Sequence, residues 1–160
     1  MQGPHIELGR ACIQKEHRKG SAVISLLWKG IIEYLNISKA NVIFGCTSLK
    51  INTAKEAALA YKYLIDINAV TEETFASPNK KFRFNDFDIW FSYYQKGLNE
   101  MQKIEAEKII PPLLKSYLKF GAKISSIPAF DKDFNCVDML TVLKKSDMPD
   151  SLVRRFQLVQ

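Results

Sequence analysis

The sequence predicts an α/β (α+β) fold in which helices flank a mixed central sheet. In the first half, two short apolar runs alternate with two helical segments, as in strands joined by a crossover helix. In the last third, two more apolar runs, separated by a polar loop, follow a helical segment. The 160 residues contain no repeat and no linker. We therefore expect residues 1–160 to form a single domain.

The first strand is predicted over residues 6–13, IELGRACI, where Gly9 marks a bulge or a close backbone approach. A polar turn over residues 14–20 follows, and Ser21 can cap a helix that runs to about residue 36. One face of this helix is predicted to be buried, because apolar residues recur on it at helical spacing. These residues are Ile24, Leu27, Trp28, Ile31 and Leu35.

The second strand is predicted over residues 41–48, NVIFGCTS, an apolar run too short for a helix. Thr53 and Glu56 have the spacing of a capping box, which predicts the start of a helix over residues 53–68. The order strand, helix, strand, helix predicts that the first two strands are parallel and joined by a right-handed crossover.

The second half is predicted to be less regular. The segment around residues 71–90 carries a dense set of aromatic side chains, which favours core packing over a groove lining. This set is Phe82, Phe84, Phe87, Trp90 and Phe91. Pro112 suits a first helical turn and Gly121 suits a helix end. The remaining predicted elements are helices over 99–108 and 113–120, strands over 122–127 and 136–143, a loop over 130–135 and a short terminal helix after Pro149.

Three cysteines, Cys12, Cys46 and Cys136, are widely spaced and form no Cys-x-x-Cys pair. We expect them to be small buried hydrophobic residues, not a disulfide framework or a metal site. No apolar run reaches the roughly 20 residues of a membrane span, and the first residues have no signal-peptide core. The predicted location is the cytoplasm, with peripheral contact at the inner membrane as a further expectation.

The net charge of +6 has two interpretations. An ordinary lysine-rich surface explains it, and so does attraction to an acidic partner such as an acyl carrier protein or an anionic membrane face. We expect no nucleic-acid partner, because the basic residues are spread over many segments and form no RNP-like or zinc-finger pattern.

Glu7 and Arg10 form the first candidate site. Residues three apart on a regular strand point to opposite faces, but a bulge at Gly9 could bring both side chains into one cleft. There the carboxylate would orient an amine and the guanidinium would bind a carboxylate. The alternative is a surface ion pair at a sheet edge, and the spacing alone leaves both interpretations open.

The turn before the first helix, QKEHRKGSA, is the second candidate site. Basic residues, a glycine and a helix N-terminus together could bind a phosphate, because free backbone amides and the helix dipole both favour an anion. Many helices start after Gly-Ser, so ordinary capping is the alternative. The residues concerned are Arg18, Lys19, Gly20 and Ser21.

Three carboxylates, Asp131, Asp133 and Asp138, form the third candidate site. Their spacing is not that of a calcium loop, so we expect Asp131 and Asp133 to cap the loop and expect no metal. Asp138 interrupts an apolar strand and needs a partner, which could be a structural arginine or Arg10. The sequence has no Ser-His-Asp set, no Walker motif and no GxGxxG, so hydrolase, NTPase and dinucleotide-binding classes lack support.

Four motifs taken in order resemble one family: ELGR, FGCTSL, PPLLKSYLKFGA and DKDFN. Together they are similar to the L-ornithine N-alpha-acyltransferase (hemolysin-like) branch of the GNAT acyltransferase superfamily. The matching segments cover most of residues 6–143. The ELGR stretch also resembles the Glu-x-Ser-Arg element of acyl-homoserine-lactone synthases, which draw on acyl carrier protein as well. The resemblance implies a GNAT-like fold whose N-terminal strands are absent from this chain.

The resemblance also implies a mechanism. In GNAT enzymes the strands corresponding to residues 6–13 and 41–48 splay apart, and the pantetheine arm of the acyl donor lies in the gap. Glu7 is then the base or the amine-orienting group, Arg10 anchors the acceptor carboxylate or holds Glu7, and a backbone amide binds the oxyanion. On the same resemblance the donor gap is lined by Cys12, Phe44, Gly45 and the basic turn, and Asp131, Asp133 and Asp138 are structural or substrate-orienting.

The chain departs from the family pattern in two places. The GNAT phosphate motif begins with Gln or Arg, whereas His17 stands at that position here. This departure favours acyl carrier protein over coenzyme A as the donor, because the carrier presents one phosphodiester instead of a pyrophosphate. The family also has strands and helices before the ELGR strand. We therefore expect residues 1–160 alone to have low or no activity, with the first strand at an unprotected sheet edge.

The predicted function is transfer of a (3-hydroxy)fatty acyl group from acyl carrier protein to the α-amine of an amino acid such as ornithine, in the biosynthesis of amino-acid-containing lipids. No bound cofactor is expected beyond the acyl-thioester donor. Two alternatives stay open. One is a coenzyme A-dependent GNAT acetyltransferase acting on a small amine, and the other is an inactive GNAT-like module that binds a carrier protein or a lipid.

Overall fold

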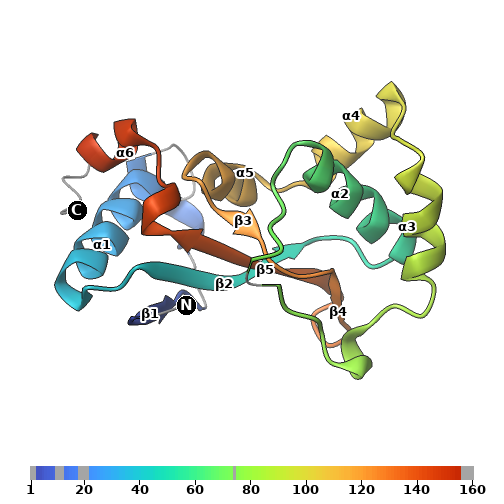
Figure 1. The fold of residues 1–160 in the computed structure, drawn as a ribbon, viewed down its shortest axis with the longest axis horizontal. Helices are drawn as coiled ribbons and strands as arrows, with labels where there is room; N and C mark the ends of the chain where they lie inside the picture. Colours follow the sequence, from blue (N-terminus) through green and yellow to red (C-terminus); the bar gives the residue numbers. More distant parts are fainter. Residues whose placement is uncertain (1–2, 10–12, 18–21, 74, 156–160) are drawn as a thin grey trace.

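The computed structural model describes residues 3–9, 13–17, 22–73 and 75–155 (Figure 1). Within these residues the strands are β1 His5–Glu7, β2 Val42–Leu49, β3 Lys123–Ile124, β4 Ala129–Asp131 and β5 Cys136–Lys144. The helices are α1 Ala22–Ser38, α2 Ala54–Asp66, α3 Phe87–Gln95, α4 Glu100–Ile109, α5 Pro112–Lys119 and α6 Asp150–Arg155. Short 3-10 helices lie at Lys15–His17, Lys80–Phe82 and Lys145–Asp147.

The strands form one mixed open sheet in the order β1-β2-β5-β3, and β4 also pairs with β5. β1 runs parallel to β2, as predicted, and the other pairs are antiparallel. The long central pair, β2 and β5, stays in register from Val42 opposite Lys144 to Leu49 opposite Val137. The predicted α/β class is confirmed, and the arrangement is consistent with a GNAT-like fold. That residues 1–160 form a single domain stays a prediction.

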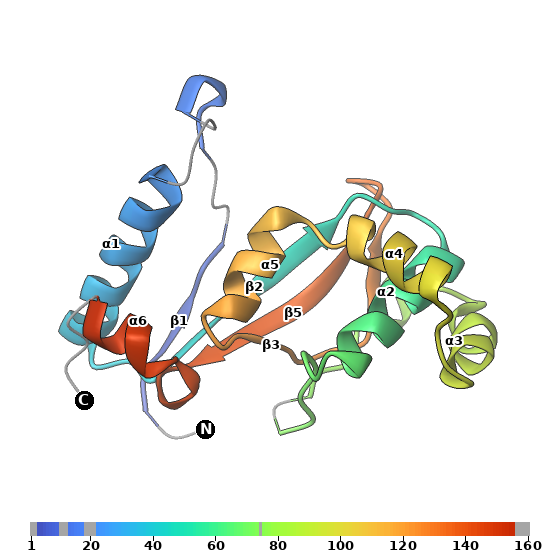
Figure 2. The ribbon, with the colours of Figure 1, turned by 90° about the horizontal axis from the view of Figure 1, so that it is seen from above.

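The central strands give the sheet two different sides. Along β2, Ile43, Thr47 and Leu49 are buried, whereas Cys46 and Ser48, which point the other way, are exposed. The alternation has period two because successive side chains of a strand point to opposite faces. Figure 1 shows the helices gathered on one side of the sheet, and Figure 2 shows α1 and α5 flanking β1. The other side of β2 is left partly open.

α1 buries a face slightly different from the predicted one. Trp28 and Leu35 are buried as expected, but Leu27 is 46% exposed and Ile32, which was not on the predicted face, is 1% exposed. The buried stripe follows the spacing 28, 32 and 35, and successive helical residues differ by about 100° around the axis, so Leu27 falls outside it. This stripe packs on Ile43 of β2 and Leu143 of β5.

Two predicted strands and one predicted loop differ from the observed elements. β1 ends at Glu7, whereas the prediction ran to residue 13, because pairing with β2 stops there. Residues 10–12 lie outside the described part. The predicted strand over 122–127 is only β3, two residues long, followed by an isolated bridge between Ser126 and Ala76. The predicted loop over 130–135 begins inside β4, which forms a hairpin with β5.

Four of the five aromatic residues of the middle segment pack in or against the core, as predicted, whereas Phe82 is in neither hydrophobic cluster. Phe87 is buried and stacks on Phe91 with ring centroids 5.6 Å apart, and both lie against Tyr61 of α2. Phe84 stacks on Phe130 of β4 at 4.8 Å. These contacts join α2 and α3, and they attach β4 to the larger of the two hydrophobic clusters.

Thr53 caps α2, and its replacement by alanine is expected to lower the free energy of unfolding by about 1 kcal/mol. The Thr53 hydroxyl accepts a hydrogen bond from the Glu56 amide at 3.2 Å and donates one to the Glu56 carboxylate at 2.6 Å. The second bond differs from the predicted capping box, in which the carboxylate would accept from the cap backbone. Urea unfolding followed by circular dichroism measures the effect, and Thr53→Ser should keep the wild-type midpoint. Equal midpoints for Thr53→Ala and wild type would show that the cap contributes nothing.

Candidate functional site

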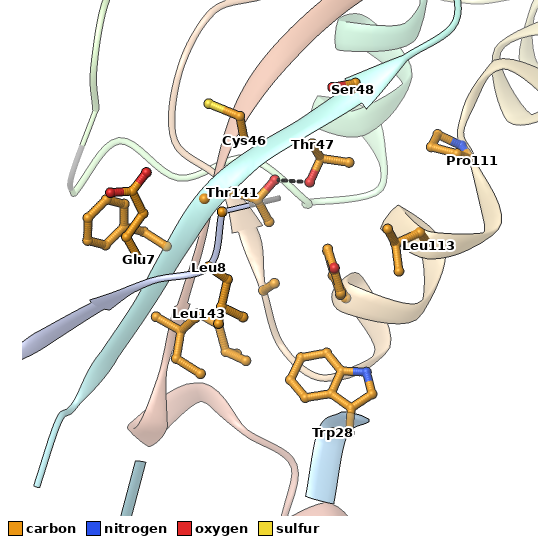
Figure 3. Close-up of a pocket in the computed structure, with 16 residues that line it drawn as sticks. Glu7, Leu8, Trp28, Cys46, Thr47, Ser48, Pro111, Leu113, Thr141 and Leu143 are labelled. Atoms are coloured by element: carbon orange, nitrogen blue, oxygen red, sulfur yellow. Dashed lines mark hydrogen bonds between the residues drawn. The ribbon is translucent and has the colours of Figure 1, made fainter. Parts of the chain in front are cut away.

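A cleft opens where β1 and β2 part (Figure 3). It has a volume of about 460 Å³ and is bounded by both strands, by β5 and by helices α1 and α5. β1 pairs with β2 only from His5 to Glu7, and the Leu8 amide then donates a bond of 2.8 Å to the Phe44 carbonyl. β2 continues to Leu49, so its second half lines the gap instead of pairing with β1 within the described residues.

Gly45 occupies the point where the two strands part. A side-chain carbon placed on Gly45 would lie 2.4 Å from the Leu8 carbonyl oxygen, far inside van der Waals contact. Only glycine therefore lets the backbone of Leu8 come this close to β2. The glycine of the FGCTSL motif thus fixes where the cleft begins.

The helix side of the cleft is apolar and walled by aromatic rings. Trp28 of α1 is 4% exposed, stacks on Phe120 with centroids 3.8 Å apart and meets the edge of Tyr117 at 5.6 Å. Leu8 and Leu143 complete this wall, and Figure 3 shows both on the same side of β2 as Trp28. Burial raises the pKa of Tyr117, so its phenol is neutral near pH 7. An uncharged, water-poor wall of this kind suits an alkyl chain.

The open side of the sheet is polar. Glu7 and Cys46 lie on the side of β2 opposite Thr47 and Thr141 (Figure 3). Asp138 of β5 stands directly across from Ser48, whose hydroxyl donates a bond of 2.5 Å to its carboxylate. The cleft therefore joins an apolar chamber on one side of the sheet to a face with two carboxylates on the other.

The carboxylates of Glu7 and Asp138 both raise the pKa of the Cys46 thiol. Cys46 is exposed as a residue, but its thiol is partly buried. This burial is the largest cause of the raised pKa of Cys46. The negative charges of Asp138 and then of Glu7 raise that pKa further. The pKa of Cys136 is also raised, by burial first and by Asp138 next. The expectation that the cysteines are buried is wrong for Cys46, because it falls on the uncovered side of the sheet.

Alkylation of Cys46 by iodoacetamide tests this geometry. Nearby negative charges disfavour the thiolate, so we expect Cys46 to react more slowly at pH 8 than an exposed cysteine of ordinary pKa. Glu7→Gln removes one of these charges, which lowers the pKa of the thiol and raises the rate at that pH. Peptide-level mass spectrometry separates Cys46 from the other cysteines. Glu33→Gln, on exposed helix surface, is the control, and equal rates for both variants would place Glu7 away from the thiol.

The structure brings only some of the predicted site residues together. Glu7, Phe44 and Gly45 all line the cleft. Asp138 accepts hydrogen bonds from the Ser48 hydroxyl and the Cys136 thiol. The sequence had predicted a partner for this carboxylate, with an arginine as one candidate. The predicted residues outside the described part are Arg10, Cys12, Arg18, Lys19, Gly20 and Ser21.

The two aspartates lie away from the cleft lining, Asp131 at the end of β4 and Asp133 in the turn that leads to β5. Asp131 accepts bonds from the amides of Asp133 and Phe134, at 2.9 and 3.1 Å, which confirms its predicted capping role. Asp133 is exposed in the same turn. Across the described residues, no three His, Cys, Asp or Glu side chains are placed to hold a metal ion. No helix in that part of the chain is long and apolar enough to cross a membrane.

Sequence reasoning missed the apolar wall and two buried threonines of the cleft. Trp28 was predicted as a core residue, and nothing in its local pattern distinguishes a core face from a cleft wall. Thr47 and Thr141 lie 94 residues apart and meet only because β2 and β5 pair in this register. Their single sequence signal is a threonine in the middle of each apolar strand.

Comparison with known proteins gives the site its context. No family model matches the chain, and no solved structure matches it. The L-ornithine N(alpha)-acyltransferase of Rhizobium meliloti is 29% identical over 86% of this chain and 44% of its own length. The proteins of the same name from Agrobacterium fabrum and Rhodobacter capsulatus are 28% and 23% identical, over 89% and 91% of this chain and 46% and 52% of their own lengths.

This chain is distantly homologous to L-ornithine N(alpha)-acyltransferases. It spans about half the length of the curated relatives it matches. The homology confirms the family resemblance of the sequence motifs. The matched stretch, at 138 to 147 residues, takes in most of the chain.

Proposed function

We propose that the chain is an N-acyltransferase domain that moves a (3-hydroxy)fatty acyl group from acyl carrier protein to the α-amine of an amino acid such as ornithine, for the synthesis of amino-acid-containing lipids. The observation that carries this proposal is the cleft itself. It joins an apolar chamber to a carboxylate-bearing face at the point where β1 and β2 part. Homology to L-ornithine N(alpha)-acyltransferases supports the reaction type.

The donor thioester is placed in the gap, with its acyl chain between α1 and α5. The wall formed by Trp28, Tyr117 and Leu143 would remove an alkyl chain from water, and each buried CH₂ contributes about 0.8 kcal/mol. A two-carbon acetyl group would gain little from such a chamber. This feature favours a long-chain acyltransferase over an acetyltransferase.

The acceptor is placed on the open face, where Glu7 lies at the mouth of the cleft. An α-amine is mostly protonated at pH 7, so Glu7 would take a proton from it, directly or through water. Asp138 stands about 13 Å further along the sheet, four residues of β2 at about 3.3 Å each. Two carboxylates on one face complement an acceptor with two cationic groups, as ornithine has.

The proposed reaction balances as a direct transfer. The neutral amine attacks the thioester carbonyl, the C–N bond forms, the C–S bond breaks, and the thiol leaves with the proton that the amine gave up. The amide of Gly9, in the cleft lining, is our proposed donor to the oxyanion. Arg10 is proposed to bind the acceptor carboxylate and the basic turn at 18–21 to bind the carrier's phosphodiester.

Donor competition tests the proposal. The purified chain is incubated with a 3-hydroxyacyl carrier protein or the matching coenzyme A thioester, and with single amino acids, and N-acyl products are followed by mass spectrometry. We expect slow formation of N-acyl-ornithine, faster from the carrier protein than from coenzyme A. Preference for acetyl-coenzyme A would favour an acetyltransferase. Carrier-protein binding without any product, from the chain and also from a version extended to the length of its relatives, would favour an inactive binding module.

A further inference from the structure

Two threonine hydroxyls interrupt the apolar wall of the cleft. Thr47 and Thr141 are 5% and 7% exposed, and their hydroxyl oxygens lie 2.8 Å apart across the β2–β5 pair (Figure 3). Both residues line the cleft. Their neighbours in the lining on this side of the sheet include Ile43 and Leu143, which offer no hydrogen-bonding group. The pair is thus a polar spot in a wall that otherwise suits an alkyl chain.

The hydrogen bonding of this pair leaves capacity for a ligand. Two hydroxyls carry two protons, and one proton serves the bond between them. Among the described residues, the other acceptor in reach is the Met139 carbonyl, 3.4 Å from the Thr141 oxygen, which is longer than a normal O–H···O bond. One hydroxyl proton and several lone pairs of the threonine pair can therefore form hydrogen bonds with a ligand hydroxyl in the cleft.

The position of the pair sets which part of a bound chain it would meet. Thr141 stands directly opposite Gly45, the residue at which β1 and β2 part. On β2, Thr47 follows Gly45 by two residues, which is about 7 Å along the strand. The pair therefore lies at the start of the apolar chamber, beside the proposed thioester position, and not at its far end. Only the first few carbons of an acyl chain would pass it.

We propose that the Thr47–Thr141 pair is a specificity element that selects acyl chains bearing a hydroxyl close to the thioester, at the third carbon. This inference rests on the proposed function. A 3-hydroxyl would complete the hydrogen bonding of the pair, whereas an unsubstituted chain leaves the two threonines bonded to each other. Because the pair is self-satisfied without a ligand, the expected preference is modest, about tenfold.

A purely structural role is the competing explanation. Cross-strand threonine pairs stabilise sheets by their mutual hydrogen bond, and such a role needs no ligand. The two explanations differ in what loss of a hydroxyl does. A structural role changes stability, or the affinity for both ligands alike, whereas a specificity role changes the ratio of affinities for two ligands that differ only in the 3-hydroxyl.

Isothermal titration calorimetry with two stable ligands separates these roles. The probes are pantetheine thioethers bearing a dodecyl-length chain with or without a hydroxyl at the position equivalent to the third carbon. The variants are Thr47→Val and Thr141→Val, which keep the side-chain shape and remove the hydroxyl. Ser126→Ala is the matched control, because Ser126 is a buried hydroxyl bonded to the Leu140 amide of the same sheet but lies outside the cleft lining.

We expect wild type and Ser126→Ala to bind the hydroxylated probe about tenfold more tightly, and both valine variants to bind the two probes within about twofold. Equal binding of both probes by wild type would overturn the inference and leave the proposed function intact. Loss of affinity for both probes alike in the valine variants would assign the pair a structural role and also overturn it. Failure of wild type to bind either probe would contradict the proposed function itself.

Discussion

Replacing Glu7 with glutamine is expected to lower the rate of acyl transfer by a factor of about 10² to 10⁴, the usual contribution of a general base. Glutamine keeps the size of the side chain but cannot accept the proton that the amine must lose. Donor affinity should stay within about twofold of wild type, because the apolar chamber that we propose holds the acyl chain lies on the other side of β2. Single-turnover product formation, measured by mass spectrometry, gives the rate and is sensitive enough for a slow enzyme.

The control for this variant is Glu33→Gln, which removes the same charge from the exposed surface of α1. We expect its rate to equal that of wild type. If Glu7→Gln also turns over at the wild-type rate, Glu7 is not the base. A fall in donor affinity equal to the fall in rate would instead show that Glu7 acts in binding.

Gly45→Ala is expected to have the largest effect on the fold at the site. The new methyl group would lie 2.4 Å from the Leu8 carbonyl oxygen, and because that atom is backbone, the two strands must move apart. We expect the free energy of unfolding to fall by about 3 kcal/mol, at the upper end of overpacking effects. Binding of an acyl-pantetheine probe should be lost as well, because Leu8 and Phe44 help to form the cleft.

Gly30→Ala provides the matched comparison. Gly30 lies on the exposed surface of α1, and a side-chain carbon there meets nothing within 4 Å. The same substitution should therefore stabilise the protein by about 0.5–1 kcal/mol, since alanine favours helix over glycine. Urea unfolding measures both variants. Similar midpoints for Gly45→Ala and wild type would mean that β1 does not approach β2 as closely as described.

The sequence predicted most of the helices and the central strands, because these follow from local periodicity. α2, with its cap at Thr53, and β5, a nearly continuous apolar run, carry their own signals. β4 was missed because a three-residue strand gains its identity only from pairing with β5. The length of β1 was overestimated for a related reason. The pattern of residues 6–13 does not show where pairing with β2 ends, and in the structure it ends at Glu7.

The candidate site was predictable in part. Glu7 and Gly45 could be named because they stand in motifs that resemble those of a family. The chamber beside them could not, because Trp28, Tyr117 and Thr141 come from three segments that only the fold brings together. Each of these residues reads as ordinary core in its own segment. The chamber proposed to hold the donor is therefore a property of the packing of α1 and α5 against the sheet.

A photoaffinity experiment tests most directly whether the cleft binds the acyl donor. A pantetheine thioether whose alkyl chain carries a diazirine is irradiated with the protein, and the labelled peptides are identified by mass spectrometry. We predict saturable labelling of α1, around Trp28, and of α5, around Leu113 and Tyr117, which an excess of unlabelled acyl-pantetheine suppresses. Labelling confined to α3 and α4, or labelling that competitor does not reduce, would contradict the assignment of the cleft as the acyl-donor site.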